Sequence, residues 1–437
     1  MPATANGSEN QVRQLQRALY QAAKRSPNRR FHSLYDKICS ESVLRRAWEQ
    51  VKANRGQGGI DGQNIREIEE GIGVTVFLKQ IQKELQEGGY HPQPVRRVEI
   101  PKASGGVRPL GIPTLKDRTV QAACRVAVEP IFEADFLDCS YGFRPKRSAR
   151  QAHEVIRKTV NSGYQWVVDG DIEKYFDSIP HEKLMKLVEM RISDRKVLRL
   201  IRGWLKAGTW KDGVRTETVL GTPQGGVISP LLSNIYLHYF DRLWHKHYGK
   251  LGKLVRYADD FVILCPREQE ADQSLKAVAS LLQRFDLRLH PEKTRKVKMV
   301  NGEEGFDFLG FHFHKVESYR YPGKLYCLSW PSKTAMKKVF GRIKDLTSNP
   351  CLFRLPLDEI VAPLNPVIRG WVNYFKVGNS SRKFTALDSY VRRRLHLVFR
   401  RKFVKITWLQ SAMKLKGLNL FKADGKVGWA SSYATGV

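Results

Sequence analysis

Two segments that carry carboxylates are the part of this sequence best suited to chemistry. Trp166–Asp177 contains Asp171, and Arg256–Leu264 contains the adjacent pair Asp259 and Asp260 inside an apolar run. Both segments predict strands, and burying carboxylates in strands is costly unless a positive group meets them. Neighbouring strands could bring Asp171 against Asp259, where a metal ion would offset their charge.

Two hard cations held about 3.5–4 Å apart by carboxylates and by a substrate's phosphates form the arrangement used for in-line phosphoryl transfer. Asp171 is the better ligand of the first segment, because it stands where the strand gives way and a strand end opens to solvent and substrate. The two segments therefore predict a nucleotidyl transferase.

The composition bounds the size and the partners of the protein. Its 437 residues exceed the comfortable size of one core, so we expect two or three domains. A net charge of +32 predicts a polyanionic partner, for which nucleic acid fits best. An anionic membrane is the alternative, but no stretch is long and apolar enough to span a bilayer.

The N-terminus and the cysteines indicate the compartment. Residues 1–30 are polar and lack the apolar core of a secretory signal, so we expect a cytosolic protein. Six cysteines are scattered without a C-x-x-C pair, which indicates reduced core thiols and neither a zinc site nor a disulfide framework.

Two glycine-containing segments could contact phosphates. Residues 54–62 hold four glycines, whose amides could cradle phosphate or simply form a turn. Val95–Lys102 and Val107–Pro113 predict a hairpin that places Lys102 and Arg108 near each other. These cations could grip a triphosphate, but on the residues alone a solvated basic edge is favoured.

Further residues suit contact with a nucleotide or a nucleic acid. Phe176 could lie beneath a nucleotide sugar and clash with a 2′-hydroxyl, or it could be an ordinary core aromatic. Gln224 could face the substrate or only bond its own loop. Ser140–Ala149 mixes aromatic residues with cations, a pattern that suits stacking on bases and contact with phosphates. Its cations include Arg144, Lys146 and Arg147.

Beyond Trp330 the sequence is strongly basic and helical. Residues 330–437 carry 21 Lys and Arg against 5 Asp and Glu. Apolar residues recur every three or four positions between Leu387 and Val398, which predicts one amphipathic helix of a three-helix unit. A merely solvated helix is disfavoured, because a surface of one sign repels itself without a partner. The arginines left for the other faces are Arg392, Arg393, Arg394, Arg400 and Arg401.

Taken together and in this order, these segments resemble the reverse transcriptases encoded by bacterial group II introns, the intron maturases. The resemblance covers about residues 42–429 and rests on four ordered motifs. They are Asp171–Asp177, Gly221–Gly226, Tyr257–Asp260 and Phe308–Phe311. The resemblance implies an α+β fold of the right-hand polymerase type, with fingers, a palm built on an antiparallel sheet, and a helical thumb or maturase domain.

The same resemblance implies four parts of the chain. Residues 1–90 would form an N-terminal extension with RNA-binding helices and a loop, and residues 91–330 the fingers and palm. Residues 331–405 would form the thumb, and residues 406–437 a short basic tail, a possible remnant of a DNA-binding region. The sequence has no cysteine and histidine cluster like that of the endonuclease in many family members, so it resembles the endonuclease-lacking lineages.

Carried over position by position, the family's metal ligands correspond to Asp171, Asp259 and the carbonyl of Ile172, with Asp260 as a neighbouring catalytic acid. Ile172 also borders the incoming nucleotide. The implied cofactor is a pair of Mg²⁺ ions, for which Mn²⁺ could substitute.

The family's nucleotide contacts correspond to five further residues. Lys102 and Arg108 match the fingers pair that holds the incoming triphosphate, which reverses the interpretation favoured above. Phe176 matches the residue that screens ribose from deoxyribose, Gln224 the pocket glutamine, and Lys293 the lysine that can protonate pyrophosphate.

The family's nucleic-acid contacts have counterparts as well. Residues 54–62, which include Arg55, are similar to the extension that clamps template RNA. Gly370–Phe375 and the arginine-bearing helix resemble the thumb, which also binds intron RNA.

The implied function is that of an RNA-directed DNA polymerase in the bacterial cytosol, which extends a DNA or RNA primer on an RNA template with dNTPs. Its other partners would be group II intron RNA, whose splicing and retrohoming it promotes, and target DNA. Two alternatives stay open, namely a splicing cofactor with incidental polymerase activity and a domesticated reverse transcriptase used in defence or repair.

Overall fold

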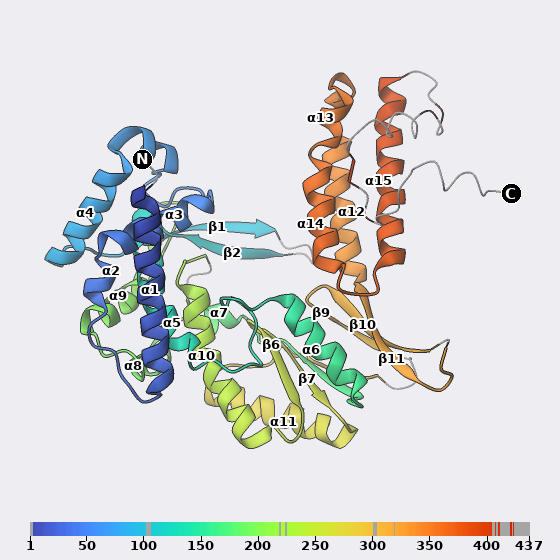
Figure 1. Ribbon diagram of the computed structural model, residues 1–437, viewed down its shortest axis with the longest axis horizontal. Coiled ribbons are helices and arrows are strands. Elements are labelled where there is room, and N and C mark those ends of the chain that lie inside the picture. Colours follow the sequence, from blue (N-terminus) through green and yellow to red (C-terminus); the bar gives the residue numbers. More distant parts are fainter. Residues whose placement is uncertain are drawn as a thin grey trace. The chain divides into compact units, whose positions relative to one another are not determined.

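The computed structural model describes residues 3–101, 106–217, 220–222, 225–299, 304–318, 320–403, 407, 410, 420, 421 and 423. The chain divides into two compact units (Figure 1). Unit 1 comprises residues 1–148 and 168–295, and unit 2 comprises residues 149–167 and 296–437. Residues 149–167 and 296–330, which the sequence assigns to the fingers and palm, thus belong to unit 2 together with the helical segment.

Unit 1 is organised around α5 (Leu115–Glu133), most of whose side chains are buried. The helix begins at Thr114, whose hydroxyl oxygen accepts a hydrogen bond from the backbone N–H of Asp117 as an N-cap. The helix continues past Pro130 to Glu133, because the Pro130 carbonyl still accepts a hydrogen bond from the Ala134 N–H.

The remaining described helices of unit 1 surround α5 and the sheets. They are α1 (Ala3–Arg25), α2 (Tyr35–Ile38), α3 (Glu41–Ala53), α4 (Val74–Glu87), α7 (Tyr175–Ser178), α8 (His181–Glu189), α9 (Arg195–Lys206), α10 (Ser229–Leu243) and α11 (Glu268–Arg284), with the π-helical turns η1 (Glu67–Ile72) and η2 (Trp244–Tyr248). α10 begins at Ser229, with Pro230 in its first turn.

One sheet of unit 1 carries the expected hairpin. It has the order β2-β1-β4-β5, with β1 (Val95–Pro101) antiparallel to β2 (Val107–Ile112). β4 (Thr209–Lys211) pairs parallel to β1 and antiparallel to β5 (Val214–Thr216). The antiparallel pairing, which extends to Pro101 and Val107, confirms the predicted hairpin.

The second sheet has the order β6-β7-β3-β8. Its strands are β6 (Lys253–Tyr257), β7 (Asp260–Cys265), β3 (Trp166–Gly170) and β8 (Arg295–Lys298). The sequence predicts one strand through residues 256–264, and this is wrong, because the chain reverses after Tyr257 and pairs Tyr257 with Asp260. The hairpin puts the two adjacent acids at the tip of two strands.

Unit 2 contains a three-stranded antiparallel sheet and a helical bundle. The sheet has the order β11-β10-β9, formed by β9 (Gly305–Phe308), β10 (Phe311–Glu317) and β11 (Leu325–Pro331). The helices are α6 (Ala149–Asn161), α12 (Lys333–Ser348), α13 (Leu357–Val361), α14 (Leu364–Phe375) and α15 (Ser381–Lys402), with the 3₁₀ turn η3 (Pro350–Arg354).

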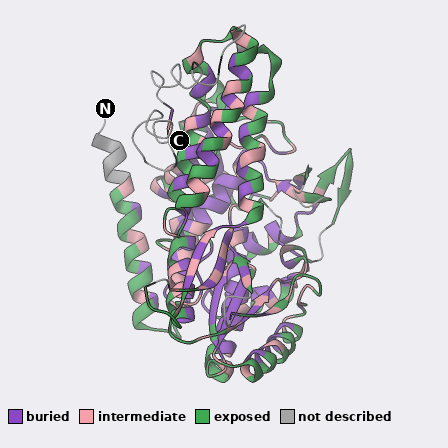
Figure 2. Ribbon diagram, turned by 90° about the vertical axis from the view of Figure 1, so that its right-hand side faces the viewer, coloured by how far each residue is buried: buried purple, intermediate pink, exposed green. Residues whose placement is uncertain are grey.

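The bundle of unit 2 has the amphipathic core that the sequence predicts. Leu387, Val391, Leu395 and Val398 on α15 are all buried and pack in one cluster with α12 and α14. Buried and exposed residues alternate around these helices, so that one face of each is turned inward (Figure 2). None of the helices among the described residues has both the length and the apolar character needed to cross a bilayer.

Candidate active site

The catalytic candidates Asp259 and Asp260 lie at the tip of the β6–β7 hairpin. Tyr257 pairs with Asp260, so only Ala258 and Asp259 make the turn. Ala258 has φ of 58°, in the left-handed region that disfavours a residue with a Cβ. The turn is therefore held in a conformation that its own sequence does not favour.

Asp171 reaches the same region from β3. It directly follows β3, which is the neighbour of β7 in the sheet. Its carbonyl accepts a hydrogen bond from the N–H of His290 at 2.8 Å, and Ile172 forms a bridge with Leu289. These contacts fix the backbone from which the Asp171 side chain projects.

The acids influence one another, which shows that they form one cluster. Burial raises the pKa of Asp259, and the charge of Asp171 raises it further. Desolvation by the surrounding protein, followed by the charges of Asp259, Asp171 and Asp169, raises the pKa of Asp260 to about 7, although the residue as a whole is exposed. The structure thus brings together the two sequence segments that were predicted to converge.

Two cations face the cluster. Lys293 Nζ lies 2.6 Å from Asp171 Oδ2, and Arg295 Nε lies 3.1 Å from Asp169 Oδ2. The Lys293 side chain is 61% exposed, whereas that of Asp171 is only 18% exposed. The lysine therefore approaches the cluster from the solvent side and can leave it at little cost.

The donor set fits divalent cations of the Mg²⁺ type. Within the described part of the chain, no three His, Cys, Asp or Glu residues already stand in a metal-binding group. However, Asp171, Asp259 and the Ile172 carbonyl would supply hard oxygen ligands. Burial and, after it, the charge of Asp171 raise the pKa of Asp259, and a bound cation would offset both effects. Lys293 would compete with a metal ion for Asp171 Oδ2.

The structure describes only some of the residues that were predicted to contact the nucleotide. Arg108 on β2 is exposed, and its charge lowers the pKa of Asp259, so it lies within electrostatic reach of the cluster. Phe176 in α7 is half-buried, and its carbonyl accepts a hydrogen bond from the Thr222 N–H at 2.7 Å. Lys102 and Gln224 lie outside the described residues.

Arg144 does not stand where a nucleic-acid contact requires it. Its side chain is 2% exposed, and its guanidinium donates to both carboxylate oxygens of Glu133 at 2.7 and 3.0 Å. It also donates to the carbonyls of Leu137 and Ser140. The burial and full pairing of this cation correct the sequence-based prediction, because no donor is left for a phosphate.

The other basic candidates of unit 1 are more accessible. Lys146 and Arg55 are exposed. Arg147 forms an ion pair with Asp138 and lies over the ring of Tyr141, at 5.8 Å from its centroid. Their contact with nucleic acid stays a prediction.

The five predicted arginines of α15 lie in different surroundings. Arg394 donates to the hydroxyls of Thr347 and Ser348 on α12, both at 2.9 Å, so it ties two helices together. Arg393 is exposed, as are Arg400 and Arg401 in the last turns. The half-buried Arg392 completes the predicted set.

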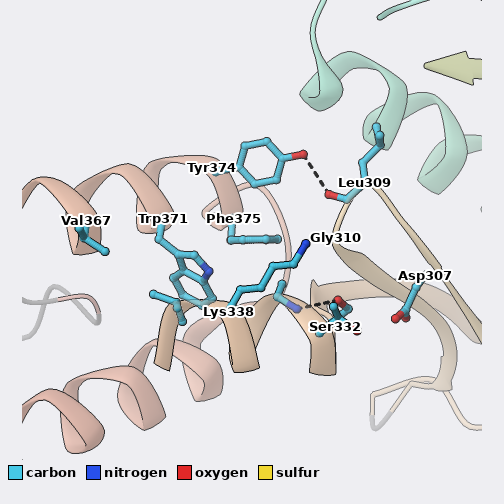
Figure 3. A pocket seen from close by; sticks show the side chains of 12 residues that line it. Asp307, Leu309, Gly310, Ser332, Lys338, Val367, Trp371, Tyr374 and Phe375 are labelled. Atoms are coloured by element: carbon cyan, nitrogen blue, oxygen red, sulfur yellow. Dashed lines mark hydrogen bonds between the residues drawn. The ribbon is translucent and has the colours of Figure 1, made fainter. Parts of the chain in front are cut away.

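Sequence reasoning missed a pocket of about 730 Å³ in unit 2 (Figure 3). Its wall is the turn between β9 and β10, where Leu309 has φ of 51° and its carbonyl accepts from the Tyr374 hydroxyl at 2.9 Å. Trp371 and Phe375 of α14 and Lys338 of α12 converge on the same space. In the sequence, only the aromatic residues within 370–375 indicated this pocket.

Comparison with known proteins finds two family matches along the chain. Residues 100–313 match the family described as reverse transcriptase (RNA-dependent DNA polymerase). Residues 336–416 match the group II intron, maturase-specific domain. Protein YkfC of Escherichia coli K12 is 36% identical over 345 residues, which cover 70% of this chain and 89% of YkfC.

Two further relatives are longer than this chain. The group II intron-encoded protein LtrA of Lactococcus lactis subsp. cremoris is 41% identical over 216 residues, which are 48% of this chain but 35% of LtrA. A 91 kDa protein in the cob intron of Schizosaccharomyces pombe is 29% identical over 430 residues, covering 82% of this chain and 52% of that protein. The chain spans about a third of LtrA and about half of the fission yeast protein in these matches.

Proposed function

The chain belongs to the reverse transcriptases and maturases encoded by group II introns, and we propose that it extends a DNA or RNA primer on an RNA template at the acid cluster of unit 1. The observation that carries the proposal is the convergence of Asp171, from the end of β3, with Asp259, from the β6–β7 turn, in an RNA-dependent polymerase domain.

The residues of the cluster have separate roles in this proposal. Asp171, Asp259 and the Ile172 carbonyl would hold the metal, with Asp260 as a neighbouring acid beside them. Two bound Mg²⁺ ions, or Mn²⁺ in their place, would activate the primer 3′-hydroxyl and neutralise charge that develops on the α-phosphate. Lys293, at the solvent side of Asp171, gives a proton to the departing pyrophosphate.

The incoming dNTP is bound by residues around the cluster. Arg108 and Lys102 hold its triphosphate from the β1–β2 hairpin, because two cations offset its charge and fix its orientation. Phe176 packs beneath the sugar and excludes a 2′-hydroxyl. Gln224 contacts the nucleotide from its loop.

The substitution Asp259→Asn tests the polymerase assignment, because it keeps the size of the side chain and removes its charge. Primer extension on RNA should fall by at least about 10²–10³-fold. Asp212→Asn is the matched control, because Asp212 is an exposed acid in a turn of the same unit. Undiminished synthesis by the Asp259 variant would refute the assignment.

A second function, the splicing of intron RNA, is favoured by the maturase-domain match at residues 336–416 and by the exposed arginines of α15. Group II intron RNA and target DNA are the partners we propose, with the cytosol as the place of action. Asp259→Asn also separates this function from polymerisation. Splicing and RNA binding should survive this substitution if they depend on the basic helices of unit 2.

A further inference from the structure

A fully buried arginine lies one strand position from the catalytic turn. Arg256 on β6 has 0% exposure, although it carries a permanent charge. Its Nε and Nη2 donate to the two carboxylate oxygens of Asp241 on α10 at 2.8 and 2.5 Å. Asp241 is also fully buried, so the pair is shielded from water on both sides.

The remaining nitrogen of the guanidinium, Nη1, reaches the turn itself. Arg256 Nη1 donates to the carbonyl of Ala258 at 2.9 Å, and to Asn234 Oδ1 at 3.1 Å. Ala258 is the strained residue that directly precedes Asp259. The guanidinium therefore links α10 to the backbone that carries the metal ligand.

A second segment encloses the turn from the other side. The Arg256 N–H donates to the Cys139 carbonyl at 2.8 Å, and the Tyr141 N–H donates to the Arg256 carbonyl at 2.9 Å. Asn234 Nδ2 donates to the Gly142 carbonyl at 2.8 Å. Residues 139–142 thus run beside β6 and are joined to α10 by the same asparagine that contacts Arg256.

Gly142 allows a very close approach to the turn. A Cβ at this position would collide with the backbone nitrogen of Ala258 and stand 2.9 Å from the carbonyl carbon of Tyr257. These neighbours are backbone atoms, which cannot rotate away like a side chain. A side chain at position 142 would therefore displace the turn.

We propose that Arg256, Asp241, Asn234 and Gly142 form a positioning network that fixes the Ala258–Asp259 turn in the geometry needed for metal binding and catalysis. The proposal rests on the proposed polymerase function of Asp259. The four residues act through the turn and do not touch the substrate. Catalytic groups must be held within about 0.5 Å, and a shift of about 1 Å can cost about 10²-fold in rate.

The first test is Gly142→Ala, which leaves every ion pair intact. The kcat for dNTP incorporation should fall about 10²-fold with little change in the KM for dNTP, because the change affects the turn and not the triphosphate contacts. Mn²⁺ binding in the absence of nucleotide, measured by electron paramagnetic resonance of the free ion, should weaken about tenfold. Gly71→Ala is the matched control, because a Cβ at Gly71 meets no atom within 4 Å.

The second test is Arg256→Lys, which keeps the charge but cannot donate to Asp241, Asn234 and Ala258 together. Arg191→Lys is its control, because Arg191 is also a buried arginine of unit 1, paired with Asp135 at 2.9 Å. Both variants should lower the melting temperature. Only Arg256→Lys should also weaken Mn²⁺ binding and kcat.

These experiments test the positioning network independently of the polymerase assignment. Loss of Mn²⁺ affinity in Gly142→Ala, with unchanged affinity for the RNA–primer duplex, supports the network. Wild-type Mn²⁺ affinity and kcat in folded Gly142→Ala overturn it, whether or not Arg256→Lys folds. If the unaltered protein binds Mn²⁺ through Asp259 but makes no DNA, the proposed function fails, while the Mn²⁺ comparison still tests the network.

Discussion

Replacement of Lys293 by alanine should strengthen the apparent binding of Mg²⁺ and at the same time slow the chemical step. Lys293 Nζ lies 2.6 Å from Asp171 Oδ2, with 61% of the lysine side chain exposed. An exposed ion pair of this kind contributes about 0.2–1 kcal/mol, and a metal ion that uses Asp171 must displace it. Removing the competing cation should therefore lower the Mg²⁺ concentration for half-maximal activity by up to about fivefold.

The same substitution should slow the chemical step. If Lys293 gives a proton to pyrophosphate, its loss should reduce the single-turnover rate of incorporation by about 10²–10⁴-fold. Lys293→Arg should restore the competition with Mg²⁺ but not the rate, because a guanidinium keeps its proton. The melting temperature should hardly change, since the pair is exposed.

The assay is single-turnover primer extension on an RNA template at a series of Mg²⁺ concentrations. Lys183→Ala is the control, because Lys183 is an exposed lysine of unit 1 that pairs with Asp286 at 2.7 Å. An unchanged rate in Lys293→Ala would refute proton donation. An unchanged Mg²⁺ dependence would show that Asp171 is not released from Lys293 when the metal binds.

Three other predictions concern the nucleotide gate, the RNA surface and the stability of unit 2. Phe176→Ala should admit ribonucleotides while Phe176→Tyr should not, and equal rNTP to dNTP ratios of kcat/KM in all three proteins would remove the gate. Alanine at both Arg400 and Arg401 should reduce the slope of log RNA affinity against log salt by about 1–2, and an unaltered slope would exclude phosphate contacts there. Burial lowers the pKa of His153 from 6.5 to about 4, so the unfolded chain binds the proton more readily between these values. The stability of unit 2 should accordingly fall by up to about 3 kcal/mol as the pH drops from 6.5 to 4. Chemical denaturation of wild type and His153→Gln at both pH values measures this, and an equal loss in the two proteins would contradict it.

The sequence predicted those features that local patterns determine. The β1–β2 hairpin follows from two alternating runs around Ser104–Gly106, and the inward face of α15 follows from the spacing of Leu387, Val391 and Leu395. The meeting of Asp171 with Asp259 was also predicted, because carboxylates in apolar strands require a common charge partner. Each of these inferences needed only nearby residues or a strong physical constraint.

Other features depend on contacts between residues that no local sequence pattern connects. The positive charges around Arg144 suggested a nucleic-acid contact, but Glu133 and two carbonyls take up its guanidinium. The β6–β7 turn was missed because it has no glycine or proline, and because its aspartates, although aspartate is common in turns, lie inside an apolar run. Its conformation is imposed by contacts with Arg256 and Gly142, and these contacts are not visible in a one-dimensional pattern.

The cations around the catalytic acids differ in what they can offset. The charge of Arg256 is taken up by Asp241 inside the protein, at 2.5 Å, so its role toward the turn is a hydrogen bond to a carbonyl. The charges that lower the pKa of Asp259 are instead those of Arg108 and Lys293, both of which reach solvent. A buried counter-ion for Asp259 would compete permanently with a metal, whereas exposed cations can be displaced or can turn to a triphosphate. The arrangement therefore keeps the backbone of the turn rigid and leaves the negative charge of its carboxylate available for exchangeable partners.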